Sequence, residues 1–338
     1  MSTPLPESGR VPSDAGPAPF HGLPKTATTA GAITAARAPA LTLDRRPRSL
    51  PRALVAQARP KQWVKNLLVV AAPAAGGVLG DGGVPLRVGL ALADFCLVAS
   101  GVYYLNDVLD VEADRRHPTK SRRPIASGEI SPILGVGVGI ALFVAGAGIG
   151  SLLGWRFLLV VGAYVVCTTA YSLRLKHVAV VDLALVASGF VIRAVAGGVA
   201  VDVPISEWFL IVTSFGSLFV VAGKRHGEFV EMGEERASTR SALGDYTLGY
   251  LRFVWMVSAA VAIAAYCLWA FEQAKAAHPI WHQLSIIPFV LALLRYALLL
   301  DQGRGTAPED ILLADRTLQV LAAVWIVIYG IAVYVGPA

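Results

Sequence analysis

The sequence predicts an all-α integral membrane protein, a bundle of nine transmembrane helices whose polar residues gather at one side of the membrane. Hydrophobic residues make up 55% of the 338-residue chain and charged residues only 15%, and the mean hydropathy is +0.61. The apolar residues occur in runs of about 20, the length that a helix needs to cross the hydrocarbon core. This composition excludes a soluble globular domain.

The first part of the chain, residues 1–50, has a different composition. It is rich in Pro, Ala, Ser and Thr, contains few large apolar residues, and is predicted to be disordered. It has no continuous apolar core of the signal-peptide type. Its basic end, from Arg45 to Arg52, is typical of a segment attracted to anionic lipid, so the net charge of +6 does not indicate nucleic-acid binding. Residues 51–338 form the predicted membrane domain.

Nine apolar windows follow the tail. The first, Trp63–Leu79, is the least regular, because Pro73 and the pair Gly76 and Gly77 interrupt it. The other predicted spans lie near Leu86–Leu105, Pro132–Leu153, Phe157–Leu173, Val178–Val201, Trp208–Gly223, Tyr250–Phe271, Ile280–Leu300 and Thr317–Val335. Gly and Pro are frequent within them, as close helix packing in lipid allows.

The distribution of basic residues between the loops predicts the orientation. Lys and Arg lie mainly in the loops that follow the second, fourth and sixth spans, whereas the opposite loops carry only Arg87, Arg156 and Lys275. Because cytoplasmic loops hold the excess of Lys and Arg, the N-terminus and the three basic loops are predicted to face the cytoplasm. The candidate polar residues of this plasma-membrane protein would then line one cavity, open to the cytoplasm.

The strongest candidate for chemistry is a stripe of carboxylates at the cytoplasmic end of the second span. Asp107, Asp110 and Asp114 are spaced i, i+3 and i+7, so a continuous helix places all three on one face. Like charges on one stripe repel unless cations hold them together, and Mg²⁺ prefers hard oxygen ligands that leave room for phosphates. The plain alternative is a solvated helix end, but ionisable groups beside lipid favour a functional role. We therefore predict Mg²⁺ on these carboxylates, with Asn106 as a supporting ligand.

Cations follow the carboxylates in a loop that Pro118 and Pro124 prevent from being one continuous helix. These cations are Arg115, Lys120, Arg122 and Arg123. A metal on the carboxylates with Lys and Arg nearby suits a magnesium-bound polyphosphate. The alternative is the ordinary positive charge of a cytoplasmic loop.

Further polar residues lie at the same predicted side or inside the spans. An Arg within a span is costly unless it is paired or lines a hydrated cavity, so Arg193 is predicted to line the pocket. Lys224 and Glu228 are spaced i, i+4, and an intrahelical ion pair is the alternative to substrate binding. Tyr171 equally fits an interfacial aromatic belt. The predicted substrate-binding residues beyond the carboxylate loop are Lys65, Asn106, Tyr171, Lys176, Arg193, Lys224, Arg225, Glu228, Arg240 and Tyr246.

The order of these motifs resembles that of UbiA-type intramembrane prenyltransferases. Asn106-Asp107-x-x-Asp110-x-x-x-Asp114 after the second span is similar to the first signature of that family. The segment from Arg122 to Gly128 and the later Tyr171-Ser172 with Lys176 also agree with it. The resemblance begins near Arg59 and runs to the C-terminus. It departs after the sixth span, where Lys224-Arg225-His226-Gly227-Glu228 replaces the second Asp-rich motif of the family.

Together with the segment from Arg59 to Asn66, this departure resembles the decaprenyl-phosphate phosphoribosyltransferase branch. The resemblance implies a pentosyltransferase that moves 5-phosphoribosyl from phosphoribosyl diphosphate (PRPP) to decaprenyl or another polyprenyl phosphate. It also implies Mg²⁺ as the cofactor, residues 51–338 as the catalytic domain, and a product used for cell-wall arabinan (arabinogalactan). The expected partners are PRPP, the polyprenyl phosphate and membrane lipid, without nucleic acid, and homo-oligomerisation is left open.

Two alternatives remain at this point. A UbiA-type aromatic prenyltransferase of quinone biosynthesis would use the same fold, but the missing second Asp motif argues against it. An anionic-solute transporter would also carry polar residues within its spans. It would more naturally show internal repeats and helices broken at the midplane, and the sequence gives no convincing sign of a repeat.

Overall fold

The structure is a computed structural model, and it describes residues 48–117, 119–232, 244–273, 279–303 and 308–335. Nearly all of the predicted disordered tail and the predicted site residue Arg240 lie outside these ranges. The described residues belong to one compact unit, Pro47–Ala338. Every regular element in this part of the chain is helical, as the sequence predicts.

Eight helices are long and apolar enough to cross a membrane, and they confirm eight of the nine predicted spans. They are α3 (Val84–Leu109), α5 (Pro132–Leu153), α6 (Trp155–Leu173), α7 (Val181–Ala200), α8 (Glu207–Met232), α11 (Leu248–Glu272), α12 with α13 (Pro279–Leu284 and Ile286–Asp301) and α15 (Arg316–Tyr334). The shorter helices are α1 (Leu50–Gln57), α4 (Val111–Arg116) and α14 (Pro308–Ala314), with the 3₁₀ turns η2 (Lys120–Arg122) and η3 (Leu175–His177).

The first predicted span, Trp63–Leu79, is not a long α-helix. The chain there forms an 11-residue 3₁₀ helix, η1 (Pro60–Val70), followed by the 5-residue α2 (Ala71–Ala75). The reason is a very close backbone approach to α7. A Cβ atom at Gly197 would collide with the carbonyl oxygen of Val69, so η1 packs main chain against main chain.

Glycines also set the spacing of α3 and α5. Four buried glycines of α5 fall on the face toward α3: Gly135, Gly139, Gly146 and Gly150. A Cβ at Gly146 would meet a side-chain methyl of Val98 on α3 at 2.6 Å. Small residues let helix backbones approach closely in lipid, where apolar burial alone gives little drive for association.

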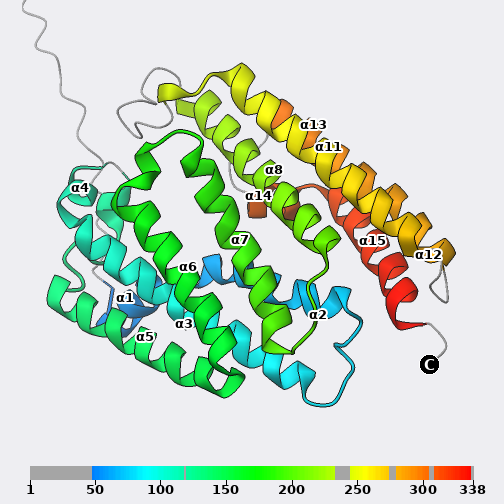
Figure 1. The fold of residues 1–338 in the computed structure, drawn as a ribbon. Coiled ribbons are helices and arrows are strands. Elements are labelled where there is room, and N and C mark those ends of the chain that lie inside the picture. Colours follow the sequence, from blue (N-terminus) through cyan, green and yellow to red (C-terminus); the bar gives the residue numbers. More distant parts are fainter. Residues whose placement is uncertain (1–47, 118, 233–243, 274–278, 304–307, 336–338) are drawn as a thin grey trace, which may run out of the picture. The chain divides into compact units, whose positions relative to one another are not determined.

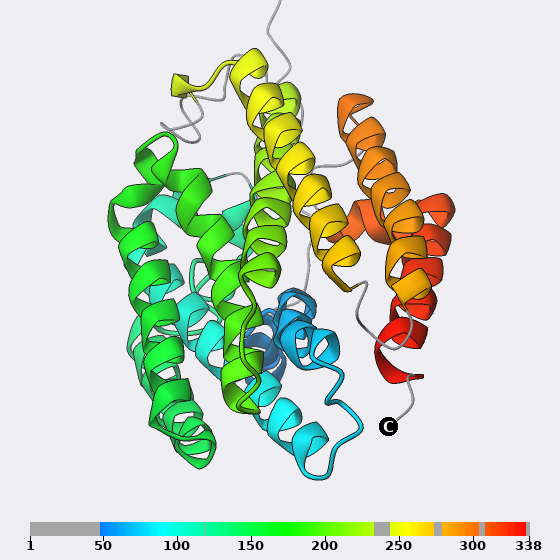
Figure 2. The ribbon, with the colours of Figure 1, turned by 45° about the vertical axis from the view of Figure 1, so that its right-hand side comes forward.

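Two groups of helices follow each other along the chain, and Figures 1 and 2 show both (α3–α7 in cyan to green, α8–α15 in yellow-green to red). The first group packs around a core that includes Phe95, Phe157 and Tyr164. The second packs around Phe219 and Leu300. α8 contacts both α7 and α11, so it joins the groups.

Four helix ends that carry polar residues lie at the same end of this bundle. Asn106 near the end of α3 contacts Ser172 near the end of α6, and Asp182 at the start of α7 contacts Arg225 near the end of α8. Because consecutive spans alternate in direction, these termini fall on one side. The fold therefore brings the predicted polar segments together.

Candidate active site

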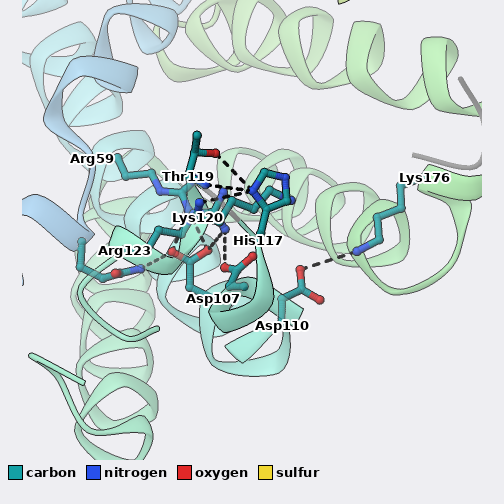
Figure 3. A network of polar contacts seen from close by, with 10 residues as sticks. Arg59, Asp107, Asp110, His117, Thr119, Lys120, Arg123 and Lys176 are labelled. Carbon is teal, nitrogen blue, oxygen red and sulfur yellow. Dashed lines mark hydrogen bonds and ion pairs between the residues drawn. The ribbon is translucent and has the colours of Figure 1, made fainter. Parts of the chain in front are cut away.

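The carboxylate stripe is divided by a break in the helix. α3 ends at Leu109 and α4 begins at Val111, with Asp110 between them at φ −92° and ψ 7°. Asp107 and Asp114 are buried, with 3% and 2% of their surface exposed. The Asp110 side chain is 43% exposed and lies 3.6 Å from the Lys176 ammonium (Figure 3). The structure thus pairs two of the three predicted carboxylates and turns the third toward η3.

Asp107 accepts hydrogen bonds from three side chains. Gln57 Nε2 donates to Oδ2 at 2.7 Å, and Arg59 Nη2 lies 2.7 Å from both carboxylate oxygens. Arg123 Nη1 donates to Oδ1 at 2.9 Å. The same Arg123 nitrogen lies 2.6 Å from Asp114 Oδ2, so one cationic group bridges the two buried carboxylates.

The donor set of this pair fits a divalent cation. Within the described residues, no three His, Cys, Asp or Glu side chains are grouped closely enough to hold a metal ion. The two converging carboxylates of Asp107 and Asp114 nevertheless enclose a position that a cationic nitrogen of Arg123 already fills. Hard oxygen atoms around a positive centre are the environment that Mg²⁺ prefers. A metal at this pair requires Arg123 to withdraw.

Asn106 and Tyr171 join neighbouring helices at the site. Asn106 Nδ2 donates to Ser172 Oγ at 2.9 Å, which ties α3 to α6. The Tyr171 hydroxyl donates to Asp182 Oδ1 at 3.0 Å and therefore belongs to a second network. The aromatic-belt interpretation of Tyr171 does not account for this contact.

The second network is centred on Arg225, whose side chain is 4% exposed. Its Nε and Nη2 donate to the two oxygens of Asp182 at 2.8 and 2.9 Å. Its Nη1 donates to Glu228 at 2.8 Å, and its Nη2 also donates to Tyr171 at 3.2 Å. Lys224 lies 3.9 Å from Glu228 and is 37% exposed. The cationic pair that replaces the second Asp-rich motif is thus balanced by two carboxylates, and Lys224 is the more accessible cation.

Tyr246 supports the start of α7. Its buried hydroxyl accepts a hydrogen bond from the Val180 N–H at 2.6 Å, and its ring stacks on Tyr250 with centroids 5.8 Å apart. Burial raises the pKa of this hydroxyl above its usual range, although the hydrogen bond from Val180 lowers it in part. The hydroxyl therefore stays protonated at neutral pH, and it positions the N-terminal end of α7 beside Asp182.

Arg193 connects several helices, and Lys65 contacts a neighbouring side chain on η1. Arg193 is buried among α3, α6, α7 and η1, where it donates to Asn66 Oδ1 at 2.8 Å, to Tyr164 at 2.8 Å and to the Gly189 carbonyl at 2.7 Å. Its guanidinium also lies 4.6 Å from the centre of the Tyr164 ring. Lys65 donates to Gln62 at 2.5 Å. The contacts of Arg193 therefore connect helices, which explains how a cation is held at this depth.

The remaining predicted cations lie on α4 and on η2, the turn that follows it. Arg115 is exposed and pairs with Glu112 at 2.8 Å, Lys120 is half-buried on η2, and Arg122 is exposed. Four further residues hold the site together but were not assigned to it from the sequence: Gln57, Arg59, Ser172 and Asp182. Asp182 could have been assigned to the site from the sequence, because an ionisable residue at the start of a span favours a functional role. Gln57 carries no such signal.

Comparisons with known proteins agree with these motifs. Residues 67–315 match the model of the UbiA prenyltransferase family. A protein of Mycobacterium tuberculosis named decaprenyl-phosphate phosphoribosyltransferase is 47% identical over 294 residues, which cover 86% of this chain and 97% of that protein. Its namesake from Corynebacterium glutamicum is 43% identical over 298 residues, covering 86% and 90%. The fold is similar to a UbiA homologue from Archaeoglobus fulgidus bound to DMAPP and Mg²⁺, with a TM-score of 0.64, 18% identity, and 85% and 99% of the two chains covered.

Proposed function

Since this chain belongs to the UbiA prenyltransferase family, among relatives named decaprenyl-phosphate phosphoribosyltransferase, we propose that it is such a pentosyltransferase. It transfers 5-phosphoribosyl from PRPP to a polyprenyl phosphate, with Mg²⁺ as cofactor, and its product serves cell-wall arabinan synthesis. The observation that carries the proposal is the asymmetry of the site. One buried carboxylate pair, Asp107 and Asp114, is left to hold metal, and Arg225 and Lys224 stand where the family has further carboxylates.

Asp107 and Asp114 would hold the metal, with the oxygens of Asp110 and Asn106 nearby. When bound there, Mg²⁺ supplies neutralising charge for the departing diphosphate. Lys120, Arg122 and Lys224 are accessible enough to contact the remaining phosphate groups. Lys176 lies 3.6 Å from Asp110 and would contact phosphate beside that carboxylate.

The reaction requires positioning and charge more than a protein nucleophile. The bond between ribose C1 and the diphosphate oxygen breaks, and its electron pair leaves with the diphosphate. A phosphate oxygen of the lipid forms the new bond to C1 from the opposite face. That oxygen is already ionised at neutral pH, so no side chain has to remove a proton. Cationic side chains held in place before the reaction are the groups that favour such a transfer.

The same proposal includes a ninth membrane crossing by η1 and α2. A 3₁₀ helix rises about 2.0 Å per residue and an α-helix about 1.5 Å, so the two segments together extend about 30 Å, the thickness of the hydrocarbon core. Arg59 precedes η1 at the Asp107 end of the bundle, whereas the Ala74 carbonyl of α2 accepts from Tyr334 at the far end of α15. Together with the distribution of Lys and Arg between the loops, this topology supports a site that faces the cytoplasm.

The test uses purified protein in detergent with PRPP labelled in its ribose and a polyprenyl phosphate. We expect the label to move into the organic-extractable lipid only when both substrates and Mg²⁺ are present. Asp107→Asn serves as the matched variant, and it should remove the activity while the protein still purifies as a single species. If the label stays in water while the protein joins a prenyl diphosphate to a hydroxybenzoate, the aromatic prenyltransferase alternative is correct.

A further inference from the structure

Arg59 is held against Asp107 by a backbone conformation that is unusual for its residue type. It lies between α1 and η1 at φ 54° and ψ 59°, the left-handed region that residues with a Cβ rarely adopt. Its guanidinium also lies 4.7 Å from the centre of the Tyr103 ring. The strained turn, the ring contact and the ion pair place this cation beside the buried carboxylate.

The carboxylate pair has no oxygen of Asp107 free for a metal. Oδ1 accepts from Arg59 and Arg123, and Oδ2 accepts from Gln57 and Arg59. Asp114 Oδ2 accepts from Arg123. A metal that binds to Asp107 must therefore displace guanidinium groups. Both arginines are 28–29% exposed, so their side chains have access to the solvent-filled side of the site.

Charge decides when such a displacement is favourable. In the present arrangement two guanidinium groups balance two buried carboxylates. A divalent cation added alone would leave an excess of positive charge at a poorly solvated site, which is unfavourable. A diphosphate supplies the missing negative charge, and guanidinium groups bind phosphate oxygens through two parallel hydrogen bonds.

We propose that Arg59 and Arg123 occupy the carboxylate pair in the metal-free protein and move to the diphosphate of the donor when metal and diphosphate bind together. This rests on the proposed function, because it takes Asp107 and Asp114 as metal ligands and a diphosphate ester as donor. Arg59 and Arg123 thereby couple the binding of the two ligands. By thermodynamic linkage, each ligand then strengthens the binding of the other by the same factor.

The diagnostic measurement is Mn²⁺ binding, by electron paramagnetic resonance or calorimetry, to full-length protein with and without inorganic pyrophosphate. Arg59→Gln should bind Mn²⁺ alone about tenfold more tightly than the wild type, because a competing guanidinium with its charged hydrogen bonds to Asp107 is lost. It should bind pyrophosphate in the presence of Mn²⁺ about tenfold more weakly, because one phosphate contact is lost. Arg123→Gln should show the same two opposite changes, and Arg59→Lys should restore part of both.

An Arg59 that only binds phosphate would leave the affinity for Mn²⁺ alone unchanged, and one that only supports the fold would weaken both affinities. Either result overturns the proposal. Arg48→Gln is the matched control, since Arg48 pairs with Glu129 at 3.4 Å on the same side of the bundle, and both of its affinities should equal those of the wild type.

If Arg59→Gln does not fold, the wild type decides by itself. Mn²⁺ alone should bind at least about tenfold more weakly than with pyrophosphate, after correction for the complex that the two form in solution. Equal affinities would contradict the exchange. Neither probe is the sugar donor or the lipid, so these results stand even if the protein transfers no phosphoribosyl group.

Discussion

Breaking the ion pair between α7 and α8 should destabilise the protein strongly. Asp182 is fully buried and accepts three hydrogen bonds, two from Arg225 and one from Tyr171. Asp182→Ala removes all three and leaves the Arg225 guanidinium buried with Glu228 as its remaining carboxylate partner. Removing one partner of a buried ion pair costs about 3–5 kcal/mol when the other charge stays without compensation. Because Glu228 still compensates part of the Arg225 charge, we expect the free energy of unfolding to fall by about 3 kcal/mol, the lower end of that range.

The double variant Asp182→Leu with Arg225→Met separates the charge effect from a general packing defect. Replacing both charges by apolar side chains of similar volume is often neutral, so most of the lost stability should return. The assay is equilibrium unfolding in mixed detergent micelles followed by tryptophan fluorescence, for which the chain has seven Trp residues. The exposed pair Arg252 and Asp301, 2.9 Å apart, is the control, and Arg252→Gln should cost less than about 1 kcal/mol. A loss below about 1 kcal/mol for Asp182→Ala, or a double variant as unstable as the single one, would refute the reasoning.

Three more predictions concern the metal, the donor and the packing of η1. Asp107→Asn should lower turnover at least about a hundredfold, and EDTA should abolish the turnover of the wild type until Mg²⁺ is returned; full activity in EDTA would exclude the metal assignment. Lys224→Ala should raise the KM for the donor about tenfold without changing the unfolding free energy, because this cation is 37% exposed and its ion pair is weak. An unchanged KM would remove Lys224 from the site. Gly197→Ala should cost about 1–3 kcal/mol, since its Cβ would collide with the Val69 carbonyl, whereas Gly162→Ala, with open space around it, should not destabilise; equal effects of the two would show that η1 is not held by this contact.

The sequence predicted what depends on local pattern. Runs of apolar residues placed seven spans within a few residues of their helices, because the requirement for a 20-residue apolar helix is set by the bilayer itself. The exception is Trp208–Gly223, whose helix α8 continues through the polar residues to Met232. The spacing of Asp107 and Asp114 predicted that their side chains lie on the same face of a helix, and in the structure both contact Arg123. The break at Asp110 was not predictable, because nothing in the sequence around it marks the end of a helix.

Contacts between distant segments account for the rest. Asp182 and Arg225 are 43 residues apart, and Gln57 and Asp107 are 50 residues apart. A pattern within one helix cannot reveal such partners. The sequence therefore predicted that Arg225 binds substrate phosphate, whereas in the structure its N–H groups donate to Asp182, Glu228 and Tyr171. For the same reason, the main-chain contact between η1 and α7 changed the form of the first predicted span.

The most direct test of the central claim follows both halves of the donor at once. PRPP carrying one label in the ribose and another in the β-phosphate is incubated with the protein, Mg²⁺ and a polyprenyl phosphate. Direct transfer at C1 predicts that the ribose label enters the lipid in equal molar amount to the β-phosphate label released as inorganic pyrophosphate. Appearance of the β-phosphate label in the lipid, or release of pyrophosphate without labelled lipid, would contradict it.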